Sequence, residues 1–246
     1  IRTETNLPFV PDGEGNLAWR AAKLLLDEKG FRDGVTIKIR KFIPVAAGMA
    51  GGSTDAAAVL VGVNRMFDLG FTKKELMERG VKLGADVPYC IMRGTALSEG
   101  IGEILTELPA PPQCHLVIAK PQISVSTKAV YGKLRVNELA PEEHPDIDGM
   151  MAAIKNGDLD GVIERLGNVL ETVTVPDHPE IARIKEMMME NGACGSLMSG
   201  SGPTVFGIYK DKELAEKACQ ALREADGGRL TRQVYLTEFY NRKKAR

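Results

Sequence analysis

The 246-residue sequence lacks the features that mark several large classes of protein. Its four cysteines are scattered without a Cys-x-x-Cys pair, and with three histidines they make neither a disulfide framework nor a convincing metal site. No apolar run approaches the roughly 20 residues of a membrane span. The net charge of −1, with acidic and basic residues interspersed, gives no nucleic-acid surface. We expect a cytoplasmic protein with reduced cysteines and no nucleic-acid or membrane partner.

The chain is long enough for one large domain or two modest ones, and its 43% apolar content is ample for a core. Three prolines between residues 109 and 112 interrupt the pattern and predict a boundary between domains 1–112 and 113–246. The second half reads as strand, helices, strand, helix and strand, which predicts an α+β sandwich. The chain begins at Ile1 in what reads as the middle of a domain, so we expect a segment before it.

Hydrophobic periodicity and capping residues predict the remaining elements. We expect Asn16 to cap a helix, Thr72 and Glu75 to form a capping box, and Asp86, shortly before Pro88, to lie on non-helical backbone. The expected strands are 1–5, 35–40, 116–119, 204–209 and 232–239, with a hairpin at 94–99 and 103–108. The expected helices are 17–29, a buried one from about residue 56 to Phe67, one from Thr72, one from Lys128, then 147–156, 158–173, 179–191 and 211–225.

A glycine-rich stretch between the predicted strand 35–40 and the buried helix is the first candidate site. It contains Gly48, Gly51 and Gly52 and continues into Ser53-Thr54-Asp55. Glycines permit positive φ and close approach of a ligand, and the first turn of a helix offers unpaired N–H groups. This arrangement suits phosphate binding. The alternative is a tight strand-to-helix turn in which Ser53 or Asp55 only caps the helix.

The loop matches neither common nucleotide-binding pattern. No lysine occurs between Lys41 and Lys73, so the Gly-Lys-Ser/Thr ending of a Walker loop is missing, and Gly-x-Gly-x-x-Gly is absent too.

A second candidate is Asp86 in Gly84-Ala85-Asp86-Val87-Pro88. Its carboxylate has the chemistry to accept a proton from a substrate hydroxyl or to hold Mg²⁺, while a turn or cap aspartate is the structural alternative. A third is the segment 196–204, in which two glycines and three serines precede an apolar strand. Such a loop approaches a ligand closely or makes a tight helix-to-strand connection.

Together these motifs resemble the GHMP kinases, the superfamily of galactose, homoserine, mevalonate and phosphomevalonate kinases. Pro44 and the glycines fit the family's phosphate loop, with Met49 for the usual Leu, Ala50 for a common Gly and Thr54 for a common Ser. The resemblance covers residues 1 to about 240 and implies a two-domain α+β fold, with an N-terminal domain like ribosomal protein S5 domain 2 and a ferredoxin-like C-terminal domain.

The resemblance also implies roles for individual residues. It makes Asp86 the catalytic base, and Ser53 or Thr54 an indirect ligand of Mg²⁺. The ATP-binding residues that it implies are Pro44, Val45, Ala46, Ala47, Gly48, Met49, Ala50, Gly51, Gly52, Ser53, Thr54, Asn16 and Lys41. The substrate-binding residues that it implies are Pro121, Val125, Ser126, Thr127, Gly200, Ser201 and Gly202. The residues alone also allow structural alternatives to nucleotide binding, with Asn16 as a helix cap and Lys41 as a solvated strand end.

Gly-Ala-Asp-Val-Pro and Met-Ser-Gly-Ser-Gly-Pro-Thr-Val-Phe most resemble the members that act on 4-(cytidine 5′-diphospho)-2-C-methyl-D-erythritol. This implies ATP-dependent phosphorylation of the 2-hydroxyl in the non-mevalonate route to isoprenoids, by a monomer or homodimer. In those members a more N-terminal segment carries a lysine that assists the aspartate and aromatic residues that stack on cytosine; this sequence has no counterpart. The alternatives are another small-molecule kinase of the superfamily, such as a homoserine or mevalonate kinase, or a nucleotide-binding module without catalysis.

Overall fold

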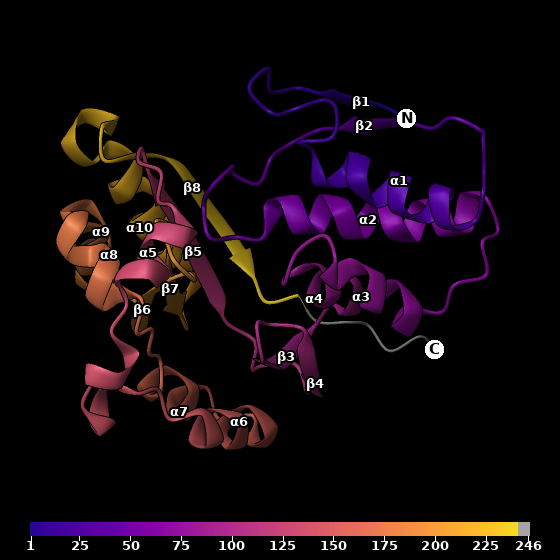
Figure 1. Cartoon of the computed structure of the whole chain (residues 1–246). Coiled ribbons are helices and arrows are strands. Elements are labelled where there is room, and N and C mark those ends of the chain that lie inside the picture. Colours follow the sequence, from indigo (N-terminus) through magenta and orange to yellow (C-terminus); the bar gives the residue numbers. More distant parts are fainter. Residues whose placement is uncertain (241–246) are drawn as a thin grey trace. The chain divides into compact units, whose positions relative to one another are not determined.

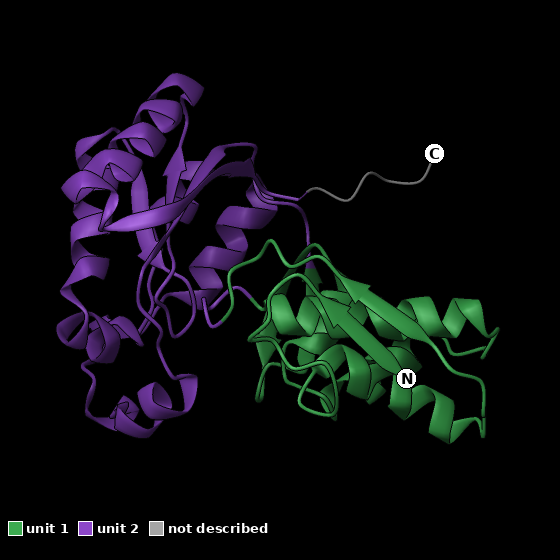
Figure 2. Ribbon diagram, turned by 90° about the horizontal axis from the view of Figure 1, so that it is seen from above, with its two compact units in different colours: residues 1–45, 50–107 green, residues 46–49, 108–246 purple. Residues whose placement is uncertain are grey.

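The computed structural model describes residues 1–240 and divides into two compact units, which Figure 1 colours by sequence and Figure 2 by unit. Unit 1 consists of residues 1–45 and 50–107, and unit 2 of residues 46–49 and the chain from 108 onward. The middle of the glycine-rich loop thus belongs with the C-terminal half of the chain. The last change of unit, between residues 107 and 108, lies just before the predicted proline-rich boundary, and the domains 1–112 and 113–246 stay a prediction.

Unit 1 is built of four helices and two small sheets (Figure 1). In chain order its elements are β1 (Arg2–Thr5), α1 (Leu17–Glu28), β2 (Thr36–Ile39), α2 (Gly51–Met66), α3 (Lys73–Val81), α4 (Val87–Met92), β3 (Thr95–Glu99) and β4 (Ile104–Leu108). Strands β1 and β2 pair in parallel, and β3 pairs with β4 as the predicted hairpin. The caps predicted at Asn16 and Thr72 are confirmed, since both side chains accept hydrogen bonds from the first turns of α1 and α3.

The core of unit 1 forms where α1 and α2 pack on each other. Small and branched side chains at helical spacing, such as Ala18, Leu25, Ala56 and Leu60, are fully buried there. Only one face of helix α2 is buried, and Ala58, which lies outside that face, is exposed to solvent. The prediction that this helix is apolar and buried on every side is therefore too strong.

Unit 2 is a four-stranded antiparallel sheet with helices. Its elements are β5 (His115–Pro121), α5 (Thr127–Lys133), the 3₁₀ turns η1 (Val136–Glu138) and η2 (Pro141–Glu143), α6 (Ile147–Asn156), α7 (Leu159–Glu164), α8 (Glu171–Asp177), α9 (Pro179–Glu190), β6 (Gly195–Met198), β7 (Val205–Tyr209), α10 (Lys212–Glu224), η3 (Ala225–Gly228) and β8 (Thr231–Glu238). The strand order is β6-β7-β5-β8, and all three pairs are antiparallel.

Along the chain the elements of this unit come in the order strand, helices, strand, strand, helix, strand. This element order and the strand order of the sheet together are those of a ferredoxin-like fold, so the predicted ferredoxin-like C-terminal half is confirmed. Alternate residues of β5 serve the two faces of the sheet. Val117 packs in the main core with Ile184 of α9 and Leu222 of α10, whereas Leu116 packs on the other face beside Ile163 of α7.

Three predicted segments of the fold are wrong. The helix expected at 158–173 is split into α7 and α8, because the Asn168 side chain accepts a hydrogen bond from Leu170 N–H and competes with helical bonding. The glycine-rich segment 196–204, expected to be a loop throughout, begins within strand β6, which is stabilised by pairing with β7. Asp86, expected on non-helical backbone, has right-handed helical backbone at the N-cap of α4, where Pro88 fits the first turn because that turn needs no N–H from it.

None of the helices in residues 1–240 has the length and apolar content of a membrane span.

Candidate active site

Helix α2 begins without a side-chain cap. Its N-cap is Ala50, in left-handed conformation at φ 49°, and the first helical hydrogen bond runs from Thr54 N–H to the Ala50 carbonyl. The alternative in which Ser53 or Asp55 caps the helix is therefore wrong. No side chain caps the N–H groups of Gly51, Gly52 and Ser53, so these donors are available to an anion at the positive end of the helix dipole.

In the loop before α2, every second residue from Ala46 to Ala50 has left-handed backbone. Ala46, Gly48 and Ala50 have φ values of 51°, 68° and 49°. The glycine prediction is thus confirmed at Gly48, whereas two alanines adopt the same backbone at a cost of about 1–2 kcal/mol each. Residues in such backbone persist where the surrounding structure over-determines them, and they cluster at ligand-binding sites.

Gly51 is the first residue of α2, and packing against neighbouring side chains explains why it has no side chain of its own. A Cβ at this position would lie 3.0 Å from Cγ2 of Ile43 and 3.1 Å from Nζ of Lys41. Lys41 Nζ in turn lies 2.5 Å from Oδ2 of Asp55, and the Lys41 side chain is only 6% exposed. Lys41 is therefore not a solvated strand end, because burial and the ion pair hold its ammonium against the first two turns of α2.

Asp86 lies at the N-cap position of α4 but does not cap it. Its carboxylate is exposed and makes no hydrogen bond among residues 1–240, and its backbone is in the right-handed helical region. One turn later the Cys90 sulfur lies 3.5 Å from the Thr54 hydroxyl of α2. Burial raises the pKa of the Cys90 thiol, and the Asp86 charge raises it further. Within unit 1, a free carboxylate therefore lies one helical turn from a residue that contacts the uncapped start of α2.

Within unit 2, the centre of the glycine-rich loop contacts the third motif. The Ser199 hydroxyl donates a hydrogen bond of 2.8 Å to the Gly48 carbonyl. A Cβ on Gly48 would lie 2.4 Å from the Ser199 carbonyl oxygen and 3.0 Å from that of Gly202. The two glycine-rich motifs, about 150 residues apart in sequence, thus meet with their backbones in direct contact.

The predicted substrate loop joins the same cluster through one contact. The Thr127 hydroxyl lies 2.8 Å from that of Ser201, which is 6% exposed. Ser126 accepts a long hydrogen bond of 3.4 Å from Ala129 N–H as the cap of α5, and Val125 is packed against the main core. Pro121 is buried at the end of β5.

The remaining predicted ATP-binding residues have structural environments of their own. Pro44 and Ala47 are buried, Val45 is exposed, and Met49 is half-buried. Asn16 is buried and uses its side chain twice, accepting from Ala18 N–H and donating to the Pro11 carbonyl. Its role as a helix cap is therefore confirmed, and its contact with a nucleotide stays a prediction.

The sequence analysis missed three side chains of unit 2 that bond the third motif: Asn168, Glu171 and Thr174. Their regular spacing of three is the signal that could have revealed them, because such residues lie on one side of a helical turn.

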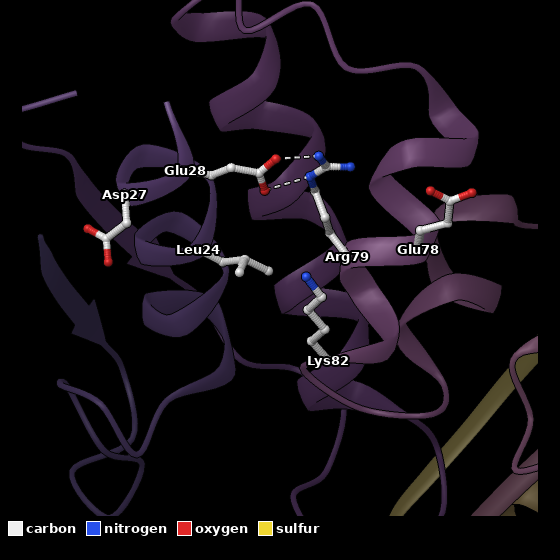
Figure 3. Close-up of a pocket in the computed structure, with 6 residues that line it drawn as sticks. All are labelled: Leu24, Asp27, Glu28, Glu78, Arg79 and Lys82. Atoms are coloured by element: carbon white, nitrogen blue, oxygen red, sulfur yellow. Dashed lines mark hydrogen bonds and ion pairs between the residues drawn. The ribbon is translucent and has the colours of Figure 1, made fainter. Parts of the chain in front are cut away.

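A separate hollow of about 750 Å³ lies between α1 and α3 and contains none of the predicted site residues (Figure 3). The facing charges in it are Glu28 and Arg79, which form an ion pair; their hydrogen bond lowers the pKa of Glu28 and raises that of Arg79. Asp27, Glu78 and Lys82 also line the hollow, so it combines charges of both signs and includes no residue of the glycine-rich loops.

Comparison with known proteins identifies the family. Residues 16–94 match the GHMP kinases N terminal domain, and residues 150–227 match the GHMP kinases C terminal domain. The chain belongs to the GHMP kinases. This membership confirms the resemblance seen in the sequence and makes the protein an ATP-dependent kinase of small molecules.

Relatives of this GHMP kinase include the 4-diphosphocytidyl-2-C-methyl-D-erythritol kinases of Lachnospira eligens and Lachnoclostridium phytofermentans. They are 52% and 50% identical over 240 and 243 residues, which cover 98% and 99% of this chain and 82% of each relative. This coverage leaves the segment expected before Ile1 a prediction.

Solved structures agree with the assignment. A crystal structure of 4-(cytidine 5′-diphospho)-2C-methyl-D-erythritol kinase is 31% identical, with a TM-score of 0.78 over 96% of this chain and 81% of that one. A homoserine kinase from Cytophaga hutchinsonii has a TM-score of 0.82 at 20% identity, covering 98% of this chain and 82% of that one, and supports the fold alone. These neighbours confirm the predicted two-domain GHMP kinase fold.

Proposed function

We propose that this GHMP kinase phosphorylates the 2-hydroxyl of 4-(cytidine 5′-diphospho)-2-C-methyl-D-erythritol, in the non-mevalonate route to isoprenoid precursors. The observation that carries the proposal is the uncapped start of α2 with the free Asp86 carboxylate in the same unit. The choice of acceptor rests on the names of relatives that are about half identical over nearly the whole chain. The free cysteines fit the cytoplasm as its location.

In this proposal the main-chain amides of residues 48–53 bind the phosphates of ATP, whereas the Thr54 amide, also expected to bind them, donates to the Ala50 carbonyl instead. Three of them open α2 without a side-chain cap, and the left-handed backbone before them brings the chain close to the ligand. Lys41 stabilises the first turns of α2 through its ion pair with Asp55. Phosphoryl transfer needs positioning and charge stabilisation more than covalent chemistry, and this arrangement supplies both.

Asp86 accepts the proton of the acceptor hydroxyl or orients that hydroxyl for attack. Its carboxylate has no partner among the described residues that would have to be displaced first. An exposed carboxylate that makes no cap suits this role better than a structural one.

Mg²⁺, when bound, neutralises charge on the phosphates. Residues 1–240 contain no cluster of three or more His, Cys, Asp or Glu side chains that could hold it alone, so it would take oxygen ligands from the bound phosphates beside the hydroxyl of Ser53 or Thr54. Between the two predicted residues, Ser53 fits better. Its hydroxyl makes no hydrogen bond within residues 1–240, whereas Thr54 donates to the Ala50 carbonyl.

A substrate panel tests the acceptor. The full chain is given ATP, Mg²⁺ and, in parallel, the cytidine substrate, homoserine or mevalonate, and ADP release is measured. We expect turnover with the cytidine substrate alone. Turnover with homoserine or mevalonate in its place would overturn the acceptor assignment, and ATP binding without turnover on any of the three would favour a nucleotide-binding module.

Replacing Asp86 by asparagine tests the catalytic assignment. We expect kcat to fall by about 10²–10⁴-fold, because the group that takes or orients the proton is lost, with the affinity for ADP unchanged. Glu78→Gln is the matched control, since Glu78 is also an exposed carboxylate of unit 1 but lies on α3. Unchanged kcat in the Asp86→Asn variant would remove Asp86 from the chemistry.

A further inference from the structure

The segment between α7 and α9 contacts the third motif with three side chains in a row. Asn168 Nδ2 donates to the carbonyls of Met198 and Gly200 at 2.9 and 2.8 Å. Glu171 Oε1 accepts from Met198 N–H at 2.7 Å, and Thr174 donates to the Ser201 carbonyl at 3.3 Å. Four backbone groups within 198–201 are therefore bonded by residues that share one side of the start of α8.

These side chains are themselves held in place. The Asn168 amide oxygen accepts from Leu170 N–H, so both ends of the amide are used. The second oxygen of Glu171 lies 2.5 Å from Lys185 Nζ on α9, and this pair is largely shielded, with 19% and 26% of the side chains exposed. Thr174 is 1% exposed. Polar groups that are shielded and fully paired fix a conformation, because any movement breaks several bonds at once.

The motif held in this way bonds the loop before α2. The Ser199 hydroxyl, between two residues bonded by Asn168, donates to the Gly48 carbonyl. Gly48 is three residues before α2 in the sequence and lies within the loop whose amides we propose to bind phosphate. A chain of hydrogen bonds thus connects Asn168 and Glu171, through the segment that carries Ser199, with Gly48 in the glycine-rich loop. All of these residues belong to unit 2.

We propose that Asn168 and Glu171 are positioning residues for the nucleotide-binding loop. They keep 198–201 in the conformation from which Ser199 bonds Gly48, and they touch no substrate themselves. This inference rests on the proposed function in one respect only, namely that the loop binds ATP. It predicts that their loss weakens nucleotide binding more than it weakens the fold.

Asn168→Ala is the central variant, and Asn191→Ala is its matched control. Asn191 is also a half-buried asparagine of unit 2 whose side chain donates to one backbone carbonyl, that of Met187 on α9, but within residues 1–240 it makes no side-chain hydrogen bond to the motif. Both variants of the full chain are measured by thermal unfolding, by calorimetric titration with ADP, and by KM for ATP. We expect a larger loss of stability in Asn168→Ala, which gives up three side-chain hydrogen bonds against one, with both variants still folded, and a weakening of ADP binding of about tenfold in Asn168→Ala alone.

Glu171 offers a graded test. Glu171→Gln keeps an oxygen that can accept from Met198 N–H and should retain most of the ADP affinity, whereas Glu171→Ala should lose it as Asn168→Ala does. Combining Asn168→Ala with Ser199→Ala tests the path: if Asn168 acts through Ser199, the double variant should bind ADP no more weakly than the worse single variant.

The outcomes separate this inference from the proposed function. Wild-type binding of ADP without turnover of the cytidine substrate overturns only the acceptor. Equal ADP affinity in Asn168→Ala and Asn191→Ala, or full additivity with Ser199→Ala, overturns the positioning role and leaves the acceptor standing. If the wild type binds no nucleotide, both proposals fall.

Discussion

At the scale of single residues, Gly48 shows how little freedom the site allows. It combines a left-handed backbone with carbonyl oxygens of Ser199 and Gly202 within 3.0 Å of where a Cβ would be. Gly200 has a similar φ, but its Cβ would meet only the Gly48 carbonyl at an ordinary 3.8 Å. Substitutions at the two glycines therefore separate the energetic cost of left-handed backbone, which both would have, from the cost of a steric clash, which only Gly48 would have.

We predict that Gly48→Ala lowers the free energy of unfolding by about 1–3 kcal/mol and raises KM for ATP, because backbone atoms must move to admit the methyl group. Gly200→Ala should cost only about 1 kcal/mol, since it meets strain in φ alone. Urea unfolding of both variants measures the difference. Equal losses would show that the Gly48 contact with Ser199 is not as close in solution.

At the scale of elements, helix α2 differs from its neighbours in how it begins. Helices α1, α3 and α10 open with a capping side chain from Asn16, Thr72 and Asp211. Helix α2, at 16 residues the longest of unit 1, opens with Ala50 and no such cap. Helices α4, α8 and α9 also begin without a side-chain cap, but of these four only α2 starts from a left-handed N-cap. This start after a glycine-rich loop is the arrangement that suits the proposed phosphate site.

We predict that Ala50→Asp raises KM for ATP by about tenfold or more, because a carboxylate at the start of α2 repels phosphate and competes for its donors. Ala50→Asn is the control, with the same shape and tolerance of left-handed backbone but no charge. Steady-state kinetics at varied ATP measures both. If the two variants have the same KM, the phosphates do not bind at this helix start.

At the scale of the whole molecule, each unit has a hydrophobic core of its own. Leu25 and Leu60 are fully buried in unit 1, and Ile184 and Met188 in unit 2. The two clusters share no residue. Each unit thus has what a separately cooperative region requires.

We predict that Leu25→Ala and Ile184→Ala each cost about 2–5 kcal/mol, the usual loss for emptying a buried site. Hydrogen exchange should rise mainly in the unit that carries the substitution. Ile101→Ala, at a side chain 73% exposed, should change stability by less than about 0.5 kcal/mol. A uniform rise in exchange across both units would show that they unfold as one.

Much of the fold could be predicted because its signals are local. Caps at Asn16 and Thr72 and the hairpin at 94–108 depend on neighbouring residues and were predicted correctly. The errors arose where distant partners decide the structure. Strand β6 exists because β7 pairs with it, and the helix at 158–173 breaks where Asn168 bonds its own backbone and the motif at 198–200.

The candidate site divides in the same way. The sequence by itself determined the family and the kind of reaction, since its glycines, hydroxyls and carboxylate stand in the order of a known family, and it predicted which residues carry the chemistry. Only the tertiary structure decided that Asp55 pairs with Lys41 and leaves α2 open, and that Gly48 meets Ser199. The physical reason is that composition and spacing act along the chain, whereas the partner of a charge or carbonyl is chosen by packing between distant segments.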